Sequence, residues 1–241
     1  SPVIQDDAVR KAVAMGIDKE GFVNTLLNGY GYVGTGAFPD TVAFGGSTLT
    51  AETYDPEGAK SVLEDAGWVD ADGDGIREKN GQKLTIRWLS YPSRQELPLL
   101  AEYAQATLKE IGIQLNLNVT ADHNSIAKDP SAWDIYVGAN VNSGLGDPTN
   151  FFSTHCLDAS TKNRGSYHSG RLEALAEQLN GTFDKDERNQ IAIEMQQQLL
   201  NDNAFVFCSF LRMSMISKAN VTGLTAHPCD FYELTAELDI N

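Results

Sequence analysis

Two pairs of histidine and cysteine carry the side chains best suited to metal or nucleophile chemistry. His155 and Cys156 lie in an irregular stretch after residues 146–148, and His227 and Cys229 lie in a second irregular segment near the C-terminus. Loops concentrate binding residues, and a neutral imidazole is a favoured ligand for nickel, copper or zinc. Together the pairs indicate a transition-metal contact, whereas either histidine alone is more typical of a hydrogen-bonded loop residue.

Nucleophilic catalysis is a weaker interpretation of the same residues. A Cys156 nucleophile would need a histidine partner, and His155, His168 and His227 are available. Adjacent side chains cannot easily face each other along a chain, which argues against His155. The chain also has no Gly-x-Ser-x-Gly, no P-loop and no histidine pair at i, i+4. We therefore predict that the protein is not an enzyme and has no catalytic cofactor.

An aspartate-rich loop copies the first half of a calcium-binding EF-hand. Asp70, Asp72 and Asp74 stand at alternate positions, but the twelfth position is Gly81 instead of a bidentate glutamate, and Glu78 falls at the ninth. Asp and Gly residues are also typical of Asx-turns that join a helix to a strand. We predict that this loop is ordered without calcium.

Charge and length exclude two broad classes of function. The 241 residues carry 33 acidic and 18 basic side chains, a net charge of −15 that repels phosphate backbones, so nucleic acid is not an expected partner. No apolar run approaches the roughly 20 residues of a membrane span. The chain is long enough to bury a hydrophobic core.

Hydrophobic periodicity predicts a strand, helix, strand unit. Apolar residues alternate over 83–90 and 113–119, and between them a helical pattern ends near Ile111. Such a unit almost always places its strands in parallel. We expect these strands and a third at 133–137 to form one sheet, the first two parallel.

Helical and extended patterns fill much of the remaining chain. Two short helices are expected in the first 28 residues, the second beginning after Asp18, and another helix is expected between Asp55 and Gly67. Two more helices follow around residues 172–179 and 191–199, and 205–217 is predicted as β structure. The fold class is α/β, one lobe with a mainly parallel sheet flanked by helices.

Short motifs in a fixed order carry a family resemblance. They are Val-Arg-x-Ala, Ile-Asp-Lys-Glu, Tyr-Asp-Pro-Glu, Ala-Gly-Trp and Asp-Gly-Asp-Gly, at residues 9–12, 17–20, 54–57, 66–68 and 72–75. The chain resembles the peptide and nickel class of extracytoplasmic solute-binding proteins that feed ABC importers. The resemblance implies a type II periplasmic-binding-protein-like lobe, and a location in the periplasm or on a lipid anchor at the cell surface.

The resemblance also implies a domain organisation. In that family the Val-Arg segment lies near mid-chain, so residues 1–241 are expected to form the C-terminal, ligand-binding lobe without its N-terminal lobe. The last roughly 40 residues are expected to return toward the missing lobe. Half of a binding cleft leaves a ligand solvated, so the lobe alone is expected to bind weakly.

The blocks at 147–167 and 226–232 resemble the nickel-binding branch most. The expected ligand is a chelate of nickel or another transition metal, with His227 and His155 contacting the metal and Arg164 a chelator carboxylate. The expected macromolecular partners are the ABC permease subunits. Two alternatives stay open: a dipeptide- or oligopeptide-binding protein of the same family, and an excised interaction domain without transport function.

An extracytoplasmic setting permits a disulfide. Cys156 and Cys229 each lie within two residues of a candidate ligand, so we hypothesise that they are bonded and hold His155 and His227 on one side of a cleft. Cys208 lies in a hydrophobic run and is predicted to be a buried core thiol. Reduced thiols are the alternative.

Overall fold

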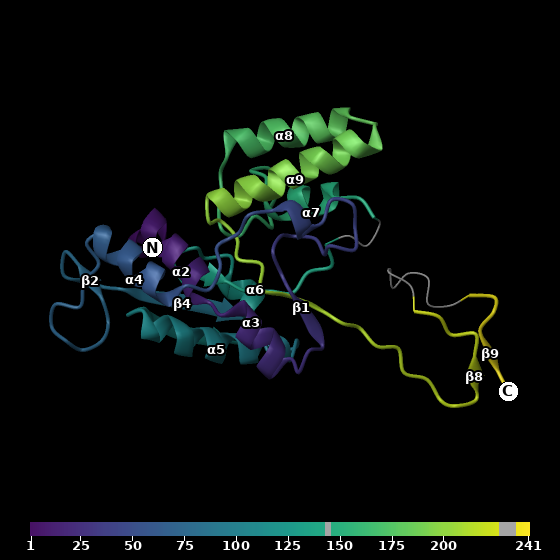
Figure 1. Cartoon of the computed structure of the whole chain (residues 1–241), viewed down its shortest axis with the longest axis horizontal. Helices are drawn as coiled ribbons and strands as arrows, with labels where there is room; N and C mark the ends of the chain where they lie inside the picture. The colour runs from purple at the N-terminus through teal and green to yellow at the C-terminus, as the bar shows by residue number, and fades with distance from the viewer. Residues whose placement is uncertain (143–145, 227–234) are drawn as a thin grey trace.

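The computed structural model describes residues 1–142, 146–226 and 235–241 (Figure 1). A three-stranded sheet with its helices forms one part of the molecule, and a group of helices, α7 to α9, forms a second part beside it. Beyond these, the C-terminal segment runs away from the body of the molecule and ends in a small two-stranded ribbon.

The sheet has the predicted strands. Strands β4 (Thr85–Ser90), β5 (Gln114–Val119) and β6 (Ile135–Tyr136) lie in the order β5-β4-β6, and β4 is parallel to both neighbours. Helix α5 (Glu96–Glu110) makes the connection from β4 to β5. The prediction that these three strands share one sheet, with the first two parallel, is confirmed. The architecture is the predicted α/β lobe with a parallel sheet flanked by helices.

An ion pair fixes the short strand β6 to β4. Arg87 donates from its backbone N and from Nε to the Asp134 carboxylate, each at 2.8 Å. Burial raises the pKa of Asp134, but the hydrogen bonds from Arg87 and Ser1 together outweigh that effect, and the pKa is held well below its usual range. The two-residue strand β6 therefore has a charged contact where its backbone ladder is short.

The first hydrophobic core lies between the sheet and its helices. Helices α2 (Asp7–Gly16) and α4 (Pro56–Asp65) pack on each other, and in Figure 1 β4 runs between α4 and α5. The helix expected between Asp55 and Gly67 is α4, and Asp55 caps it, because its carboxylate accepts from Gly58 N at 2.9 Å. The largest fully buried residues of this core are Phe22, Leu63, Leu84, Ile86, Trp88, Leu108, Ile111 and Ile113.

A second core holds the helical part together. It joins α7 (Thr149–His155), α8 (Gly170–Gly181) and α9 (Lys185–Asn201) to a glycine-rich connector, residues 29–46, that precedes α4. Gln196 of α9 is fully buried: its Oε1 accepts from Ala37 N at 3.0 Å and its Nε2 donates to Phe44 O at 2.8 Å. One side-chain amide thus satisfies two buried backbone groups of the connector.

Two predicted elements differ from the structure. The helix expected after Asp18 is α3 (Lys19–Gly21) followed by a π-helical turn, η1 (Phe22–Leu26), which ends where Asn28 adopts a left-handed φ of 47°. Of the β structure expected over 205–217, the strand β7 (Ser209–Leu211) is present, and it pairs antiparallel with β1 (Gly31–Val33). Past Leu211 the backbone has no partner strand among the described residues until β8.

The remaining elements are short: α1 (Pro2–Gln5), η2 (Gly46–Thr48), β2 (Glu78–Lys79), β3 (Gln82–Lys83), α6 (His123–Ile126), β8 (Val221–Thr222) and β9 (Asp239–Ile240). Among the described residues, no helix combines the length and hydrophobicity that crossing a membrane requires.

Arg77 joins the ends of two helices. Its Nε and Nη1 donate to the carbonyl oxygens of Ile111 and Trp68, both at 2.9 Å, and its Nη2 pairs with Glu64 at 2.9 Å. Gly112, with a φ of +86°, lies against the Arg77 stem, where a Cβ would come within 2.7 Å of Cγ. The guanidinium therefore caps the chain ends after α4 and α5 together.

We expect Arg77→Met to lower the free energy of unfolding by about 2 to 3 kcal/mol, because two buried carbonyl groups lose their donors. Urea denaturation followed by circular dichroism measures this loss. Lys60→Met is the matched control. Among the described residues Lys60 pairs with Glu57 alone, whose side chain is 80% exposed, so this substitution should change stability by less than about 0.5 kcal/mol. Equal effects of both substitutions would contradict the capping role.

Candidate functional site

Three aromatic side chains gather at the carboxyl edge of the parallel sheet. Tyr91 directly follows β4, His123 begins α6 shortly after β5, and Tyr136 is the last residue of β6. Because parallel strands end at the same edge, residues that follow them meet there. Arg164, from the irregular segment between α7 and α8, joins them.

The four side chains form a continuous stack, which we call the edge stack: Tyr91, His123, Tyr136 and Arg164. The rings of Tyr91 and His123 lie 4.2 Å apart at 30°, and His123 Nδ1 lies 2.8 Å from the Tyr136 hydroxyl. The Arg164 guanidinium lies 4.1 Å from the centre of the Tyr136 ring, a cation–π distance. Arg164 Nη2 also donates to Asn124 Oδ1 at 2.7 Å.

Burial and the neighbouring positive charge keep His123 neutral at pH 7. Burial lowers the pKa of His123 most, the charge of Arg164 lowers it further, and Asp122 opposes both. Burial likewise raises the pKa of Tyr136. Arg164 is therefore the charged member of the edge stack at neutral pH.

His155 is the last residue of α7 and is half-buried. Its ring centre lies 5.5 Å from that of Phe151. Burial lowers its pKa, and the charges of Lys162 and Arg164 add to the effect. The neutral form that these effects favour is the form of imidazole that ligates metals.

The structure places Cys156 in the second core, only 2% exposed. Burial raises the pKa of its thiol, so Cys156 is not an activated nucleophile. His227 and Cys229 lie outside the described residues. Their predicted pairing with His155 and Cys156, in a metal site and in a disulfide, stays a prediction.

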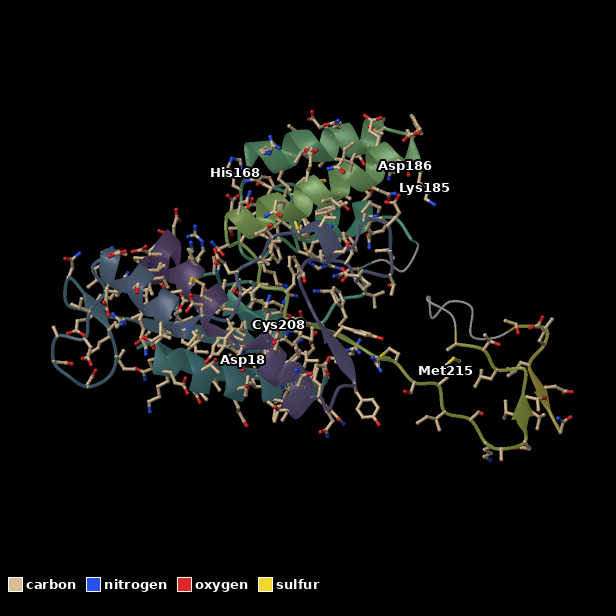
Figure 2. The ribbon with its side chains drawn as sticks, in the orientation of Figure 1. Asp18, His168, Lys185, Asp186, Cys208 and Met215 are labelled. Atoms are coloured by element: carbon tan, nitrogen blue, oxygen red, sulfur yellow. The ribbon has the colours of Figure 1, made fainter. Side chains whose placement is uncertain are left out.

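Cys208 packs against the first core but is half-buried, where a fully buried thiol was expected. The reason is its position: it directly precedes the short strand β7, where the chain leaves the body of the molecule, and Met215 lies on the segment beyond (Figure 2). Burial still raises the pKa of the Cys208 thiol to about 11.

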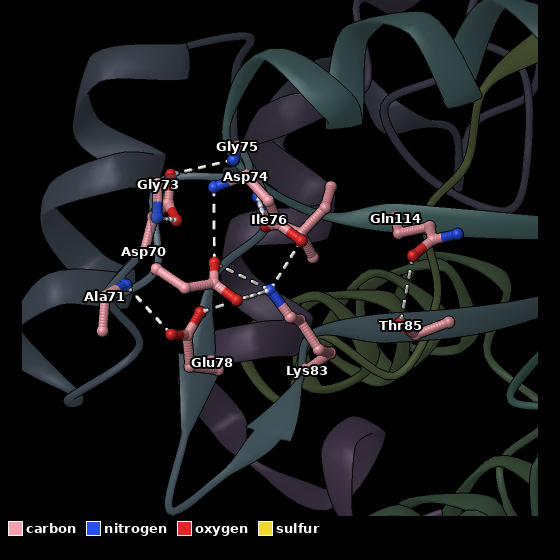
Figure 3. Close-up of polar contacts among 11 residues, drawn as sticks. Asp70, Ala71, Gly73, Asp74, Gly75, Ile76, Glu78, Lys83, Thr85 and Gln114 are labelled. Carbon is pink, nitrogen blue, oxygen red and sulfur yellow. Dashed lines mark hydrogen bonds and ion pairs between the residues drawn. The ribbon is translucent and has the colours of Figure 1, made fainter.

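The carboxylates of the aspartate loop are bonded to a lysine side chain and to backbone N–H groups of the protein itself (Figure 3). Lys83 Nζ lies 2.8 Å from Asp72 and 2.7 Å from Asp74, and 4.0 Å from Glu78. The Asp70 carboxylate accepts from the backbone N–H groups of residues 73 and 75, at 2.8 and 2.9 Å. Although carboxylate oxygens of Asp70, Asp72 and Glu78 lie within 4.8 Å of one another, the Lys83 ammonium already pairs with Asp72 and Asp74 in this loop.

The sequence predicted His155 and Arg164 as site residues, and that stays a prediction; it did not single out His123, Tyr91 or Tyr136, which the structure brings to the same edge as Arg164. A signal was present: each missed residue comes at or just after the carboxyl end of a predicted strand of one parallel sheet, which is where α/β proteins bind ligands. The structure brings Arg164 to this edge and places His155 near enough for the charge of Arg164 to act on it.

Comparison with known proteins assigns the family. Residues 1–163 match the family model described as "Bacterial extracellular solute-binding proteins, family 5 Middle". The chain belongs to this family. Its recognition as a member of the peptide and nickel class is thereby confirmed.

The relatives that this chain resembles are named for different ligands, nickel or peptides. The Nickel-binding protein NikA of Staphylococcus aureus is 28% identical over 185 residues, 77% of this chain and 35% of the relative. The Nickel-binding periplasmic protein of Escherichia coli is 25% identical over 225 residues, 92% and 43% of the two chains. The Oligopeptide-binding protein AppA of Bacillus subtilis is 22% identical over 237 residues, 94% and 42%. The chain thus spans about two fifths of the length of these relatives.

Two solved structures show the same fold. NikA from S. aureus in complex with Ni(L-His)2 has a TM-score of 0.81 at 23% identity, over 98% of this chain and 49% of that chain. AppA from B. subtilis in complex with a nonapeptide has a TM-score of 0.80 at 21% identity, over 96% and 47%. Both support the type II periplasmic-binding-protein architecture.

We expect that about 1 mM calcium, the concentration range of weak extracellular calcium sites, will not change the melting temperature of this protein. The ammonium of Lys83 competes for the same carboxylates. Thermal unfolding with calcium chloride and with magnesium chloride measures this. A calcium-specific rise that Asp72→Asn removes would contradict the prediction.

We also expect Arg164→Gln to raise the pKa of His123 while leaving it below 6.5, because the substitution removes the positive charge but not the burial. Nuclear magnetic resonance titration of the histidine ring protons measures the shift. In the wild type the unfolded chain takes up this proton at a higher pH than the folded chain does. His123 therefore lowers stability as the pH falls through and below 6.5. An unchanged pKa would show that Arg164 does not act on the His123 ring.

Proposed function

We propose that this chain is the ligand-binding lobe of the substrate-capture protein of an ABC importer, and that its ligand is a chelated transition metal, with nickel favoured. The nickel-binding names of the relatives that are 28% and 25% identical support this ligand. The single structural observation that carries the proposal is the position of His155, a half-buried imidazole kept neutral near the cationic Arg164 at the carboxyl edge of the sheet.

The proposed roles divide between metal and chelator. His155 and His227 contact the metal, since neutral imidazoles are suitable ligands for nickel. Arg164 contacts a carboxylate of the chelator, since its planar guanidinium matches two carboxylate oxygens. A disulfide between Cys156 and Cys229 holds the two histidine segments together.

The proposed organisation places residues 1–241 in the C-terminal lobe of a two-lobed protein. The segment after β7 supports this, because it leaves the body of the molecule with Met213 80% and Ile216 93% exposed (Figure 1). A segment that leaves the body of the molecule in this way is available to contact another lobe. In this proposal the last roughly 40 residues return toward the other lobe.

Capture requires no chemistry. A ligand that contacts both lobes stabilises the closed state by the additional contacts made there, and the closed form then docks on the permease subunits in the membrane. The protein acts outside the cytoplasm, free in the periplasm or on a lipid anchor.

A peptide ligand is the second candidate. Its support is the similarity to AppA with a nonapeptide, whose TM-score of 0.80 nearly equals that of the nickel-bound relative. A peptide would be bound through its backbone and termini.

Isothermal titration calorimetry of the full native form of the protein, with nickel and L-histidine, tests the proposal. We expect His155→Ala to weaken binding at least roughly 10-fold, since removing even the groups that orient metal ligands weakens binding by roughly 10- to 100-fold. The matched control is His168→Ala, because His168 is 74% exposed and its Nδ1 lies 2.6 Å from Asp158. Tight binding of a tripeptide without nickel binding would favour the peptide candidate.

A further inference from the structure

A continuous chain of hydrogen bonds links members of the edge stack through Asn124. Arg164 Nη2 lies 2.7 Å from Asn124 Oδ1, and Asn124 Nδ2 lies 3.3 Å from His123 Nε2. His123 Nδ1 in turn lies 2.8 Å from the Tyr136 hydroxyl. One side-chain amide therefore connects the cation of the edge stack to its imidazole.

The chemistry of Arg164 fixes the direction of every bond in this chain. A guanidinium has N–H donors and no acceptor, so the atom of Asn124 that faces it is the amide oxygen. The amide nitrogen then faces His123, and because it can only donate, Nε2 of the ring carries a lone pair. The single N–H of the neutral imidazole is therefore on Nδ1 and donates to the Tyr136 oxygen. The bond directions assign one neutral tautomer to His123.

The groups around the His123 ring favour the neutral form that this chain of bonds requires. The rings of Tyr91 and Tyr136 lie 4.2 and 6.0 Å from it, centre to centre. Burial lowers the pKa of His123 most and the charge of Arg164 lowers it further, whereas Asp122, the residue before it, has a smaller opposite effect. Bond direction and surroundings thus agree on a neutral ring at pH 7.

A second proton on His123 is incompatible with the chain of bonds. The proton goes to Nε2, and the new N–H points at the amide nitrogen of Asn124, so two donors face each other at 3.3 Å. Turning the amide over offers its oxygen to His123 but places its nitrogen against Arg164 Nη2, which is also a donor. Protonated His123 and Arg164 therefore compete for a single acceptor.

Asn124 is the residue that moves in this competition. The imidazole is held by Tyr136 at 2.8 Å and by the stacked ring of Tyr91 at 4.2 Å, and a protonated ring gains a cation–π attraction to that tyrosine. Asn124 is exposed, so its amide can turn without disturbing a packed core. The imidazolium also repels the Arg164 guanidinium, which favours release of the guanidinium.

We propose that Asn124 is a positioning residue for Arg164 and that protonation of His123 turns it away, so that the edge stack holds the guanidinium at neutral pH and releases it at acidic pH. One proton passes from solvent to Nε2, and the bond from Arg164 to Asn124 is exchanged for one from His123 to Asn124. Where Arg164 contacts the ligand, capture weakens as the pH falls, and this consequence alone rests on the proposed function.

Nuclear magnetic resonance of the 241-residue chain tests the switch without a ligand. The nitrogen shifts of the His123 ring identify which nitrogen carries the proton, and we expect Nδ1 at a pH above the pKa of His123. The heteronuclear Overhauser effect of the Arg164 Nε–Hε group measures whether the side chain is held. We expect an ordered guanidinium above that pKa and a mobile one below it.

Asn124→Asp separates the switch from a general effect of pH, because a carboxylate accepts from Arg164 and from protonated His123 at the same time. We expect it to raise the pKa of His123 by about one unit or more and to keep Arg164 ordered on both sides of the titration. Asn124→Ala should leave the guanidinium mobile at both pH values. The matched control is Ser125→Asp, which adds the same charge at the next exposed position and should preserve the pH response of Arg164.

Each result decides the inference. A neutral His123 with its proton on Nε2, an Arg164 side chain equally ordered at both pH values, or unfolding of the chain before His123 titrates would overturn the switch. The response must also survive His168→Ala, because His168 is 74% exposed and pairs with Asp158 instead. None of these results bears on the proposed function, which the nickel and L-histidine calorimetry tests separately at pH 7.

Discussion

The parallel pairing of β4 with both β5 and β6 is the constraint on which the candidate site depends. Parallel strands place their carboxyl ends at one edge, so residues separated widely in sequence meet there without being part of a local motif. The helix α5 that makes the parallel connection also supplies much of the first core, including Leu108. Packing and site geometry are consequences of the same connection.

Electrostatics reinforces that geometry at the weakest strand. Strand β6 is only two residues long, Ile135 and Tyr136, yet the Tyr136 ring makes the cation–π contact with Arg164. The pair of Arg87 with the buried Asp134 fixes the residue directly before β6. A charged contact thus stabilises the backbone from which an aromatic side chain reaches the edge stack.

Local pattern predicted the sheet well and the site only in part. Strict alternation around Leu115 and Leu117, and a helix that stops at Gly112, depend on neighbours in sequence, so the strand, helix, strand unit could be predicted. The position of Arg164 in the edge stack depends on a contact with Asn124, 40 residues away in sequence, and hydrophobic periodicity cannot predict contacts at such a separation. The β structure expected beyond Leu211 was too long because an alternating pattern shows that a strand can form but not whether a partner strand is available.

Gln196 has a consequence for how this chain can diverge from its relatives. Its side chain acts as donor and acceptor at once, and both partners are backbone groups, those of Ala37 and Phe44. A glutamate would lose the donor and a leucine both functions, whereas the side chains at 37 and 44 take no part in these bonds. The tolerance to substitution therefore differs across this contact. Position 196 needs an amide side chain, whereas position 44 is restricted by the volume of the second core and position 37 by that volume and by the need for a backbone N–H, which excludes proline.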